Sequence, residues 1–302
     1  MNGAPARRLR AGGLDFELGS RPWLMGIVNA TPDSFSDDGS TRTLDARVAL
    51  AAELLDAGAD VIDIGGESGV TNRPPVDPSE EIARVVPLIE RVAGELGALV
   101  SVDTYKPAVA EAAIDAGAAI VNDVSGLRDP ALADVCARTG AGLVLMHTRV
   151  APKQKLLDPG LYDDVAADVR RFLAERMAEA VERGCDPEQI VLDPGPDFAK
   201  TPAQTVESLR GLESLHELGR PLLLAISRKD FVGAITGRPP RERLAGTLAA
   251  LAYGADAGGH IFRMHDVAAA ADFLAVRGVL RGDRELGAET TLAEELRREP
   301  TG

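Results

Sequence analysis

The sequence has few cysteines, no long apolar segment and too few basic residues to balance its acidic ones. Cys136 and Cys185 are the only cysteines among 302 residues, which favours unpaired thiols in a cytosolic protein over a disulfide framework. No apolar run approaches the roughly 18 residues that a membrane helix needs. The basic N-terminus MNGAPARRLRAGG has no apolar core after it, so we expect no secretory signal and a cytoplasmic protein.

The deficit of positive charge narrows the possible partners. The chain has 33 basic and 47 acidic residues and a net charge of −14, which argues against nonspecific binding to nucleic acid or to a membrane surface. An anionic small substrate remains compatible, because local charge determines a site. The four histidines, His147, His216, His260 and His265, show no zinc-ligand spacing. We therefore expect any metal to be Mg²⁺ that arrives with a phosphate-bearing substrate.

Short and nearly continuous apolar runs recur along the chain. Such runs are typical of parallel strands that are covered on both faces. Helical patterns lie between them: in segment 44–55 the apolar residues fall on one face, and Gly58 fits the end of that helix. The predicted strands are 23–29, 61–65, 99–104, 120–125, 142–147, 189–195, 221–227 and 260–266.

The predicted helices have clear start signals, in the form of a capping residue followed by proline. Asp77-Pro78, Asp129-Pro130, Asp186-Pro187 and Thr201-Pro202 all have this form. Eight strands thus alternate with eight helical segments, which favours a closed (β/α)₈ TIM barrel over an open doubly wound sheet.

The same pattern divides the chain into three parts. We expect an N-terminal arm and small hairpin at 1–22, a single TIM-barrel catalytic domain at 23–282 and a polar C-terminal tail at 283–302. The segment GGLDFELGS, before the first barrel strand, is expected to form the hairpin and to plug the bottom of the barrel.

Polar residues stand at the end of every predicted strand. A single residue of this kind is commonly a helix cap or a turn residue. In a TIM barrel, however, the carboxyl ends of the strands form the active-site rim, and all eight runs contribute to it. The pattern therefore indicates an active site formed by Asn29, Asp63, Glu67, Asp103, Asn122, Asp123, His147, Arg149, Asp193, Lys200, Ser227, Arg228, Lys229, Arg263, His265 and Asp266.

One part of this set suits a flat heterocycle. Asp103, Asn122 and Asp193 offer carboxylates and an amide. Buried groups of this kind commonly fix a ring whose edge carries N–H donors, as in a guanidine-like heterocycle.

Another part suits a phosphate or diphosphate. Arg263, His265, Lys229 and Asn29 supply cations and hydrogen-bond donors. Lys229 alone would also fit a Schiff-base aldolase. It lies beside Arg228 at the strand exit, however, and is not shielded within the strand, which argues against that alternative.

Eight segments of the chain resemble the signatures of the dihydropteroate synthase family. In chain order they are GIVNATPDSFSDDG, DIGGES, SVDTYKP, IVNDVSGL, LVLMHTR, LDPG followed by Phe198 and Lys200, ISRK and HIFRMHDV. The resemblance runs from about residue 23 to residue 276, which is nearly the whole predicted barrel.

The resemblance implies a transferase of folate biosynthesis that works as a homodimer. Such enzymes join 6-hydroxymethyl-7,8-dihydropterin diphosphate to p-aminobenzoate, an arylamine, and release diphosphate. By motif, the pterin would be held by Asp103, Asn122, Asp193 and Lys229, the Mg²⁺ and diphosphate by Asn29, Arg263 and His265, and the p-aminobenzoate by Thr71, Arg73, Phe198 and Ser227. The catalytic residues would be Lys229, Arg263, His265 and Asp193.

The sequence departs from the family pattern at three places. Three residues are extra in the loop 69–73, if Thr71 and Arg73 stand for the family's threonine and arginine. Asp197 and Ala199 replace glycines, so we expect a carboxylate near the second-substrate site. Ala225 also replaces a glycine, where a methyl group would crowd the pterin.

These departures leave two alternatives open. One is a divergent paralogue that keeps the pterin and diphosphate pocket but lacks dihydropteroate synthase activity. The other is a folate-binding methyltransferase domain on the same barrel.

Overall fold

Eight parallel strands form a barrel in the computed structural model, which describes residues 7–31, 43–68 and 74–297. The strands follow the order β8-β7-β6-β5-β4-β3-β10-β9. A parallel bridge between Leu192 and Leu222 joins the two ends of this order, so the sheet closes and the predicted TIM barrel is confirmed. The barrel strands are β3 (Trp23–Asn29), β4 (Val61–Gly65), β5 (Val100–Asp103), β6 (Ile120–Asp123), β7 (Gly142–Met146), β8 (Ile190–Asp193), β9 (Leu223–Leu224) and β10 (Ile261–Met264).

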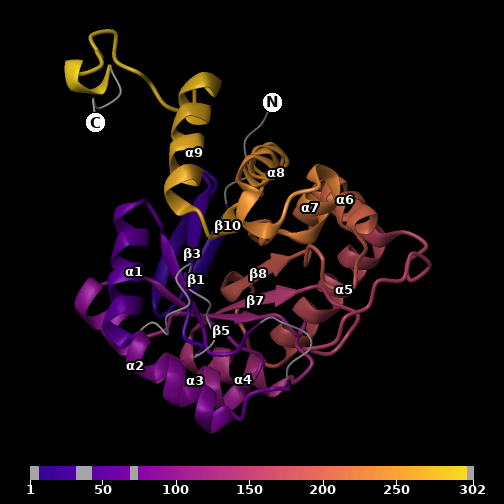
Figure 1. The fold of residues 1–302 in the computed structure, drawn as a ribbon. Helices are drawn as coiled ribbons and strands as arrows, with labels where there is room; N and C mark the ends of the chain where they lie inside the picture. The colour runs from indigo at the N-terminus through magenta and orange to yellow at the C-terminus, as the bar shows by residue number, and fades with distance from the viewer. Residues whose placement is uncertain (1–6, 32–42, 69–73, 298–302) are drawn as a thin grey trace.

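Helices surround the strands on the outside of the barrel (Figure 1). Each crossover between neighbouring strands contains at least one of them, and the last crossover contains α7 and α8. The helices are α1 (Leu44–Asp56), α2 (Pro78–Leu96), α3 (Pro107–Asp115), α4 (Ala131–Thr139), α5 (Val165–Glu182), α6 (Pro202–Arg210), α7 (Asp230–Thr236), α8 (Leu244–Asp256) and α9 (Val267–Arg281).

The predicted start signals act as caps, with two differences. Asp77 caps α2, and Thr201 forms a reciprocal capping box with Gln204 at α6. Asp186 caps only a short 3-10 helix, η1 (Pro187–Gln189), that leads into β8. Helix α4 begins one residue later than its signal, since Pro130 itself is the N-cap residue.

An antiparallel hairpin precedes the barrel. Strand β1 (Arg7–Ala11) pairs with β2 (Leu14–Leu18), and the turn between them has Gly12 and Gly13 at φ 58° and 78°. Leu9, Ala11 and Leu18 are fully buried against inward-facing barrel side chains that include Met25, Val61 and Ile120. The hairpin therefore packs into one end of the barrel. The predicted segment GGLDFELGS supplies its turn and its second strand, whereas its first strand comes from the basic segment before it. That basic segment can form a strand because Arg8 and Arg10 alternate with the buried Leu9 and Ala11.

The rest of the core lies between the strands and the helices. Valine, leucine and isoleucine side chains from β4, α2 and their neighbours form this layer, and Leu88, Ile89 and Val85 are fully buried. Beyond α9, the chain continues to the short 3-10 helix η4 (Glu294–Leu296), which lies away from the barrel (Figure 1). The division of the chain at residues 22 and 282 stays a prediction. None of the helices in the described ranges has the length and apolar character needed to cross a membrane.

Candidate active site

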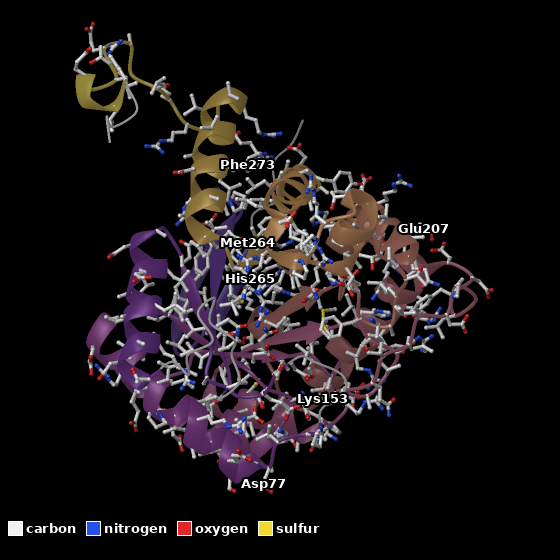
Figure 2. All side chains as sticks on the ribbon, viewed as in Figure 1. Asp77, Lys153, Glu207, Met264, His265 and Phe273 are labelled. Carbon is white, nitrogen blue, oxygen red and sulfur yellow. The ribbon has the colours of Figure 1, made fainter. Side chains whose placement is uncertain are left out.

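A cavity of about 620 Å³ lies at the carboxyl ends of the barrel strands. His265 and Lys153, both labelled in Figure 2, lie in its wall. The structure brings together in this wall nine of the eleven residues to which the resemblance assigned a role: Asn29, Asp103, Asn122, Asp193, Phe198, Ser227, Lys229, Arg263 and His265. Thr71 and Arg73 lie outside the described residues, so their predicted roles stay predictions.

Arg263 is held between two carboxylates inside the barrel. Its Nε lies 2.6 Å from Oδ2 of Asp63, and its Nη2 lies 3.0 Å from Oδ2 of Asp103. The Asn122 side chain donates to the same Asp63 oxygen at 3.2 Å. Asp63 therefore fixes the positions of two predicted substrate-binding side chains from two other strands.

Asp63 is the site residue whose importance the motif assignment missed. It is fully buried and does not line the cavity itself. The feature that could have indicated its role is its place as a charged residue between Ile62 and Ile64, in a strand of five buried residues. Since side chains alternate along a strand, a lone carboxylate there points into the barrel.

Burial changes the titration of the cavity carboxylates. Burial raises the pKa of Asp103 to about 7, against the opposing effect of the Arg263 cation. Burial also raises the pKa of Asp193 to about 6, although Oδ1 of Asp193 accepts a hydrogen bond of 2.7 Å from the Gly195 amide. Both carboxyl groups thus change charge near neutral pH, which is typical of functional sites.

Lys229 projects over an aromatic ring in the cavity wall. Its Nζ lies 4.4 Å from the ring centroid of Phe198, within the range of a cation–π contact. Burial lowers the pKa of Lys229, while the carboxylates of Asp197 and Asp193 oppose that shift. The lysine therefore lies beside both the predicted pterin carboxylate and the predicted p-aminobenzoate wall.

His265 and Ser227 form a polar pair in the cavity wall. The Ser227 hydroxyl lies 3.0 Å from Nδ1 of His265 and accepts a hydrogen bond of 3.1 Å from the His265 amide. Desolvation by the cavity wall, and then the cations of Arg263 and Arg228, lower the pKa of His265 to about 4. The imidazole is therefore neutral at pH 7.

The loop after β8 keeps a glycine-like backbone where the sequence has replaced glycine. Asp197 and Ala199 have φ values of 67° and 50°, in the left-handed region that favours glycine. Two side-chain bonds hold Asp197 there: Thr205 donates to its Oδ1 at 3.1 Å, and the Asp230 amide donates to its Oδ2. The loop therefore has a backbone that glycine would adopt readily, and Asp197 lines the cavity.

Two predicted rim residues lie behind the cavity. Lys200 and His147 are both buried and neither lines it. Nζ of Lys200 lies 2.7 Å from Nδ1 of His147, and Nε2 of that histidine lies 3.0 Å from Oδ1 of Asp168.

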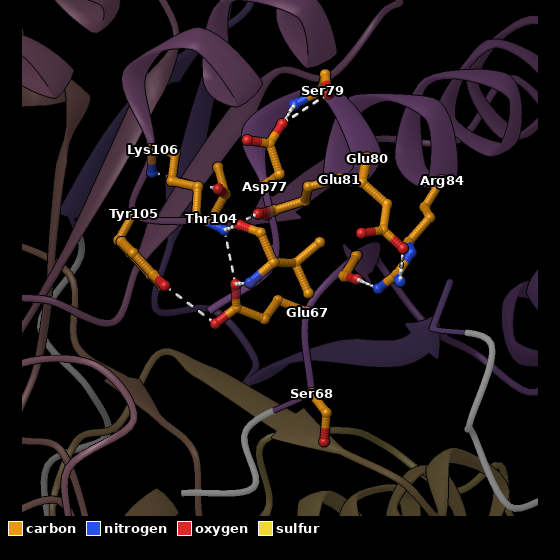
Figure 3. Close-up of polar contacts among 12 residues, drawn as sticks. Glu67, Ser68, Asp77, Ser79, Glu80, Glu81, Arg84, Thr104, Tyr105 and Lys106 are labelled. Carbon is orange, nitrogen blue, oxygen red and sulfur yellow. Dashed lines mark hydrogen bonds and ion pairs between the residues drawn. The ribbon is translucent and has the colours of Figure 1, made fainter. Parts of the chain in front are cut away.

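A second buried charge cluster lies beside the loop that follows β4 (Figure 3). Lys106 contacts the carboxylates of Glu67 and Glu81 and also donates to the Val76 carbonyl at 2.7 Å. The other Glu67 oxygen accepts from the Tyr105 hydroxyl at 3.0 Å. The predicted rim residue Glu67 thus has a place in a network that ties this loop to the segment after β5.

The donor groups in the cavity fit an Mg²⁺ ion carried by a substrate. Asn29 offers an amide oxygen at the end of β3. The described residues contain no cluster of three histidine, cysteine, aspartate or glutamate side chains that would form a complete cage. Mg²⁺ is commonly bound through one or two protein groups and substrate phosphates, so the donor set fits an ion that arrives with diphosphate.

A closed (β/α)₈ barrel with carboxylates, an amide and cations around one cavity is the architecture of a pterin-binding enzyme. The family model described as "Pterin binding enzyme" matches residues 25–265. A dihydropteroate synthase of Bacillus subtilis is 45% identical over 245 residues, which cover 81% of this chain and 83% of that protein. The chain belongs to the dihydropteroate synthase family.

Solved structures agree with this assignment. The dihydropteroate synthase of Xanthomonas albilineans with 4-aminobenzoic acid has a TM-score of 0.84 and 43% identity, and the match covers 92% of this chain and 99% of that one. The same enzyme in complex with 7,8-dihydropteroate has a TM-score of 0.81 and 43% identity, with coverage of 91% and 98%.

Proposed function

We propose that the chain is a dihydropteroate synthase that joins 6-hydroxymethyl-7,8-dihydropterin diphosphate to p-aminobenzoate and releases diphosphate. The observation that carries the proposal is the wall in which Asn122, Asp103 and Arg263 meet around Asp63. The printed ligands of the similar X. albilineans structures, 4-aminobenzoic acid and 7,8-dihydropteroate, support this choice of substrates.

In this proposal the pterin ring lies against the carboxylate wall. Ionised Asp193 and Asp103 accept hydrogen bonds from ring N–H groups, and Asn122 pairs with an adjacent edge. Lys229 extends over Phe198 and fixes the ring from the side of the second substrate. This arrangement holds the methylene carbon in position for attack, and such positioning is a large part of catalysis.

The reaction breaks the bond between the methylene carbon and the diphosphate oxygen. The amine nitrogen of p-aminobenzoate forms a bond to that carbon and loses one proton, and diphosphate leaves with the electron pair of the broken bond. Arg263 and His265 face the charge that builds on the leaving group, and this favours the transition state over the ground state. Mg²⁺ held by Asn29 and the diphosphate would supply further positive charge.

The second substrate is proposed to lie between Phe198 and Ser227, with Thr71 and Arg73 from the loop after β4. Both Phe198 and Ser227 line the cavity, and Lys229 lies between the two proposed subsites. The p-aminobenzoate ring would pack against Phe198, which leaves its amine directed at the pterin methylene group.

Three finer points belong to the same proposal: a homodimer, a cytoplasmic location and a requirement for Mg²⁺. Large apolar side chains on α8 and α9 support a dimer, since Tyr253, Val276 and Leu280 are 46%, 60% and 82% exposed. The buried free thiols Cys136 and Cys185 fit a reducing compartment. Light scattering of the purified protein tests the dimer.

A coupled assay of diphosphate release, with dihydropteroate identified by mass spectrometry, tests the activity. We expect turnover that needs both substrates and Mg²⁺ and that is lost in Asp193→Asn. A folded protein that releases no diphosphate would refute the proposal. The paralogue and methyltransferase alternatives are not favoured, because identity of 45% to a dihydropteroate synthase extends over 81% of the chain.

A further inference from the structure

Lys200 is a buried lysine that the proposed mechanism does not use. It is 1% exposed, and its Nζ donates to the carbonyls of Gly195 at 3.0 Å and Phe198 at 3.2 Å. The third neighbour of Nζ is Nδ1 of His147, at 2.7 Å. A buried ammonium group is costly unless its donors are satisfied, and here each of the three Nζ donors has a hydrogen-bond partner.

The chemistry of these groups fixes the protonation of His147. Below about pH 7 Lys200 is mostly charged, and a charged lysine has no acceptor, so Nδ1 of His147 must then accept from Lys200. Nε2 must then carry the proton and donate to the Asp168 carboxylate at 3.0 Å. Burial and the Lys200 cation lower the pKa of His147 to about 3, which agrees with a neutral ring. Lys200, His147 and Asp168 therefore form one directed chain of hydrogen bonds.

The two carbonyls bonded by Lys200 belong to the strained loop 195–199. Gly195, Asp197 and Ala199 all have left-handed backbones, with φ values of 63°, 67° and 50°. A Cβ on Gly195 would lie only 2.1 Å from the carbonyl oxygen of His147, so the loop rests directly on β7 and the residues after it. A backbone of this kind persists only where its surroundings hold it in place.

We propose that Lys200, oriented by His147 and Asp168, is a positioning residue that clamps the loop 195–199 and thereby fixes Asp193 and Phe198 toward the substrates. This inference rests on the proposed function, because it assigns Asp193 to the pterin and Phe198 to the arylamine. Lys200 acts from behind the cavity and does not touch either substrate.

The charge of Lys200 acts on the same site. Its pKa is lowered to about 7 by burial, against the opposing effects of Asp193, Asp168 and Asp197, while Lys229 adds to the lowering. In return, Lys200 is one of the cations, with Lys229 and Arg263, that limit the rise in the pKa of Asp193 caused by burial. Removal of the Lys200 cation should therefore raise the pKa of Asp193 further.

The test compares Lys200→Met with Lys200→Arg, and uses Arg170→Met as the control. Arg170, on α5, forms an exposed ion pair with Glu217, so its loss removes a cation without touching the cavity. Calorimetric titration with the pterin diphosphate is repeated between about pH 5 and pH 8. It gives the affinity and its acid limb, which is the pH range over which the affinity falls as the pH is lowered.

We expect Lys200→Met to weaken pterin diphosphate binding about tenfold at pH 7 and to move its acid limb upward by about one pH unit. Its KM for p-aminobenzoate should rise through the loss of Phe198 positioning. Lys200→Arg should restore the acid limb, and Arg170→Met should match the wild type. Unchanged affinity and acid limb in folded Lys200→Met would overturn the proposal.

Nitrogen NMR of His147 in the wild-type protein provides a test that needs neither a variant nor turnover. We expect an unprotonated Nδ1 and a protonated Nε2 down to about pH 5. A protonated Nδ1 would overturn the proposed clamp even if Lys200→Met does not fold. If the wild type binds pterin diphosphate without turnover, the proposed synthase activity fails while the clamp is still tested by binding.

Discussion

Nε of Arg263 lies 2.6 Å from Oδ2 of Asp63, which joins the last barrel strand to a fully buried carboxylate on β4. Despite burial, which opposes charge on Arg263, Asp63 and then Asp103 raise the pKa of this guanidinium. The cation thus stays charged inside the barrel, beside the carboxylates proposed to hold the pterin.

Replacing Asp63 with alanine tests this relationship. The change removes the buried carboxylate that pairs with Arg263. Breaking such a buried pair costs about 3–5 kcal/mol of unfolding free energy. We also expect weaker pterin diphosphate binding, since Asn122 loses its acceptor. Urea unfolding and calorimetry measure the two effects.

The control for Asp63→Ala is Glu217→Ala, which removes a carboxylate from the exposed ion pair with Arg170. Exposed pairs contribute at most about 1 kcal/mol, so stability and pterin binding should stay close to the wild-type values. Equal effects of the two changes would show that Asp63 has no special role.

Pterin binding should fall as the pH drops through 7 and then 6. Burial raises the pKa values of Asp103 and Asp193 to about 7 and about 6, and only the ionised groups accept from ring N–H donors. The apparent values belong to the interacting set, because Asp103 also faces Arg263 and Asp63. Calorimetry across this range measures the limb, and a flat profile would contradict the assignment.

The same two carboxyls have the opposite effect on stability. Their folded pKa values of about 7 and about 6 lie above the unfolded value of about 3.9. Between the unfolded and the folded pKa values, the folded state therefore binds more protons than the unfolded state. Their contribution to the unfolding free energy is therefore greatest below about pH 4 and is lost as the pH rises toward 7. Asp193→Asn should make the stability profile flatter over this interval.

Asp197→Gly should lower the KM for p-aminobenzoate several-fold. Asp197 lines the cavity, where its carboxylate would repel the anionic second substrate that we propose. Glycine also accepts the φ of 67° without strain, although the bonds to Thr205 and Asp230 are lost. Steady-state kinetics at fixed pterin diphosphate measure the change.

The matched control is Ala199→Gly, which relieves a φ of 50° in the same loop without changing charge. Its KM for p-aminobenzoate should stay near the wild-type value, whereas Asp197→Asn should follow Asp197→Gly. A KM that rises in both Asp197 variants would show that the carboxylate supports the second substrate instead of opposing it.

Strand-end residues such as Asn122 and Asp193 could be predicted because parallel strands bring their carboxyl ends to one rim. Asp63 is different, since its role depends on the barrel register that faces it toward Arg263. Lys200 is adjacent to a recognisable motif, yet a sequence does not show that the chain folds back and places its side chain behind the cavity. Contacts between residues that follow or belong to different strands decided both cases.

The backbone of the substituted loop was equally out of reach. Asp197 and Ala199 replace glycines of the family pattern, and the sequence alone does not show which backbone they adopt. The structure keeps the left-handed path because Thr205, Asp230 and Tyr162 bond to these two residues. Strain at two positions is thus balanced by neighbours that are distant in the sequence.

Lys106→Met should destabilise the protein strongly, because it leaves Glu67 and Glu81 without their shared cation (Figure 3). Despite burial, which raises it, the pKa of Glu67 is lowered by Lys106 and the Val76 amide, so this carboxylate stays ionised at pH 7. Loss of one partner from such a network costs about 3–5 kcal/mol of unfolding free energy.

The double variant Lys106→Met with Glu81→Gln separates charge from packing. Glu81 is 1% exposed, so neutralising it should recover part of the stability lost in Lys106→Met. The depressed pKa of Glu67 gives stability above the unfolded value of about 4.3 that is lost as the pH falls below it, and Lys106→Met should reduce this dependence. Urea unfolding at pH 7 and pH 4 measures both effects. A double variant less stable than Lys106→Met would show that Glu81 contributes through its hydrogen bonds and not through its charge.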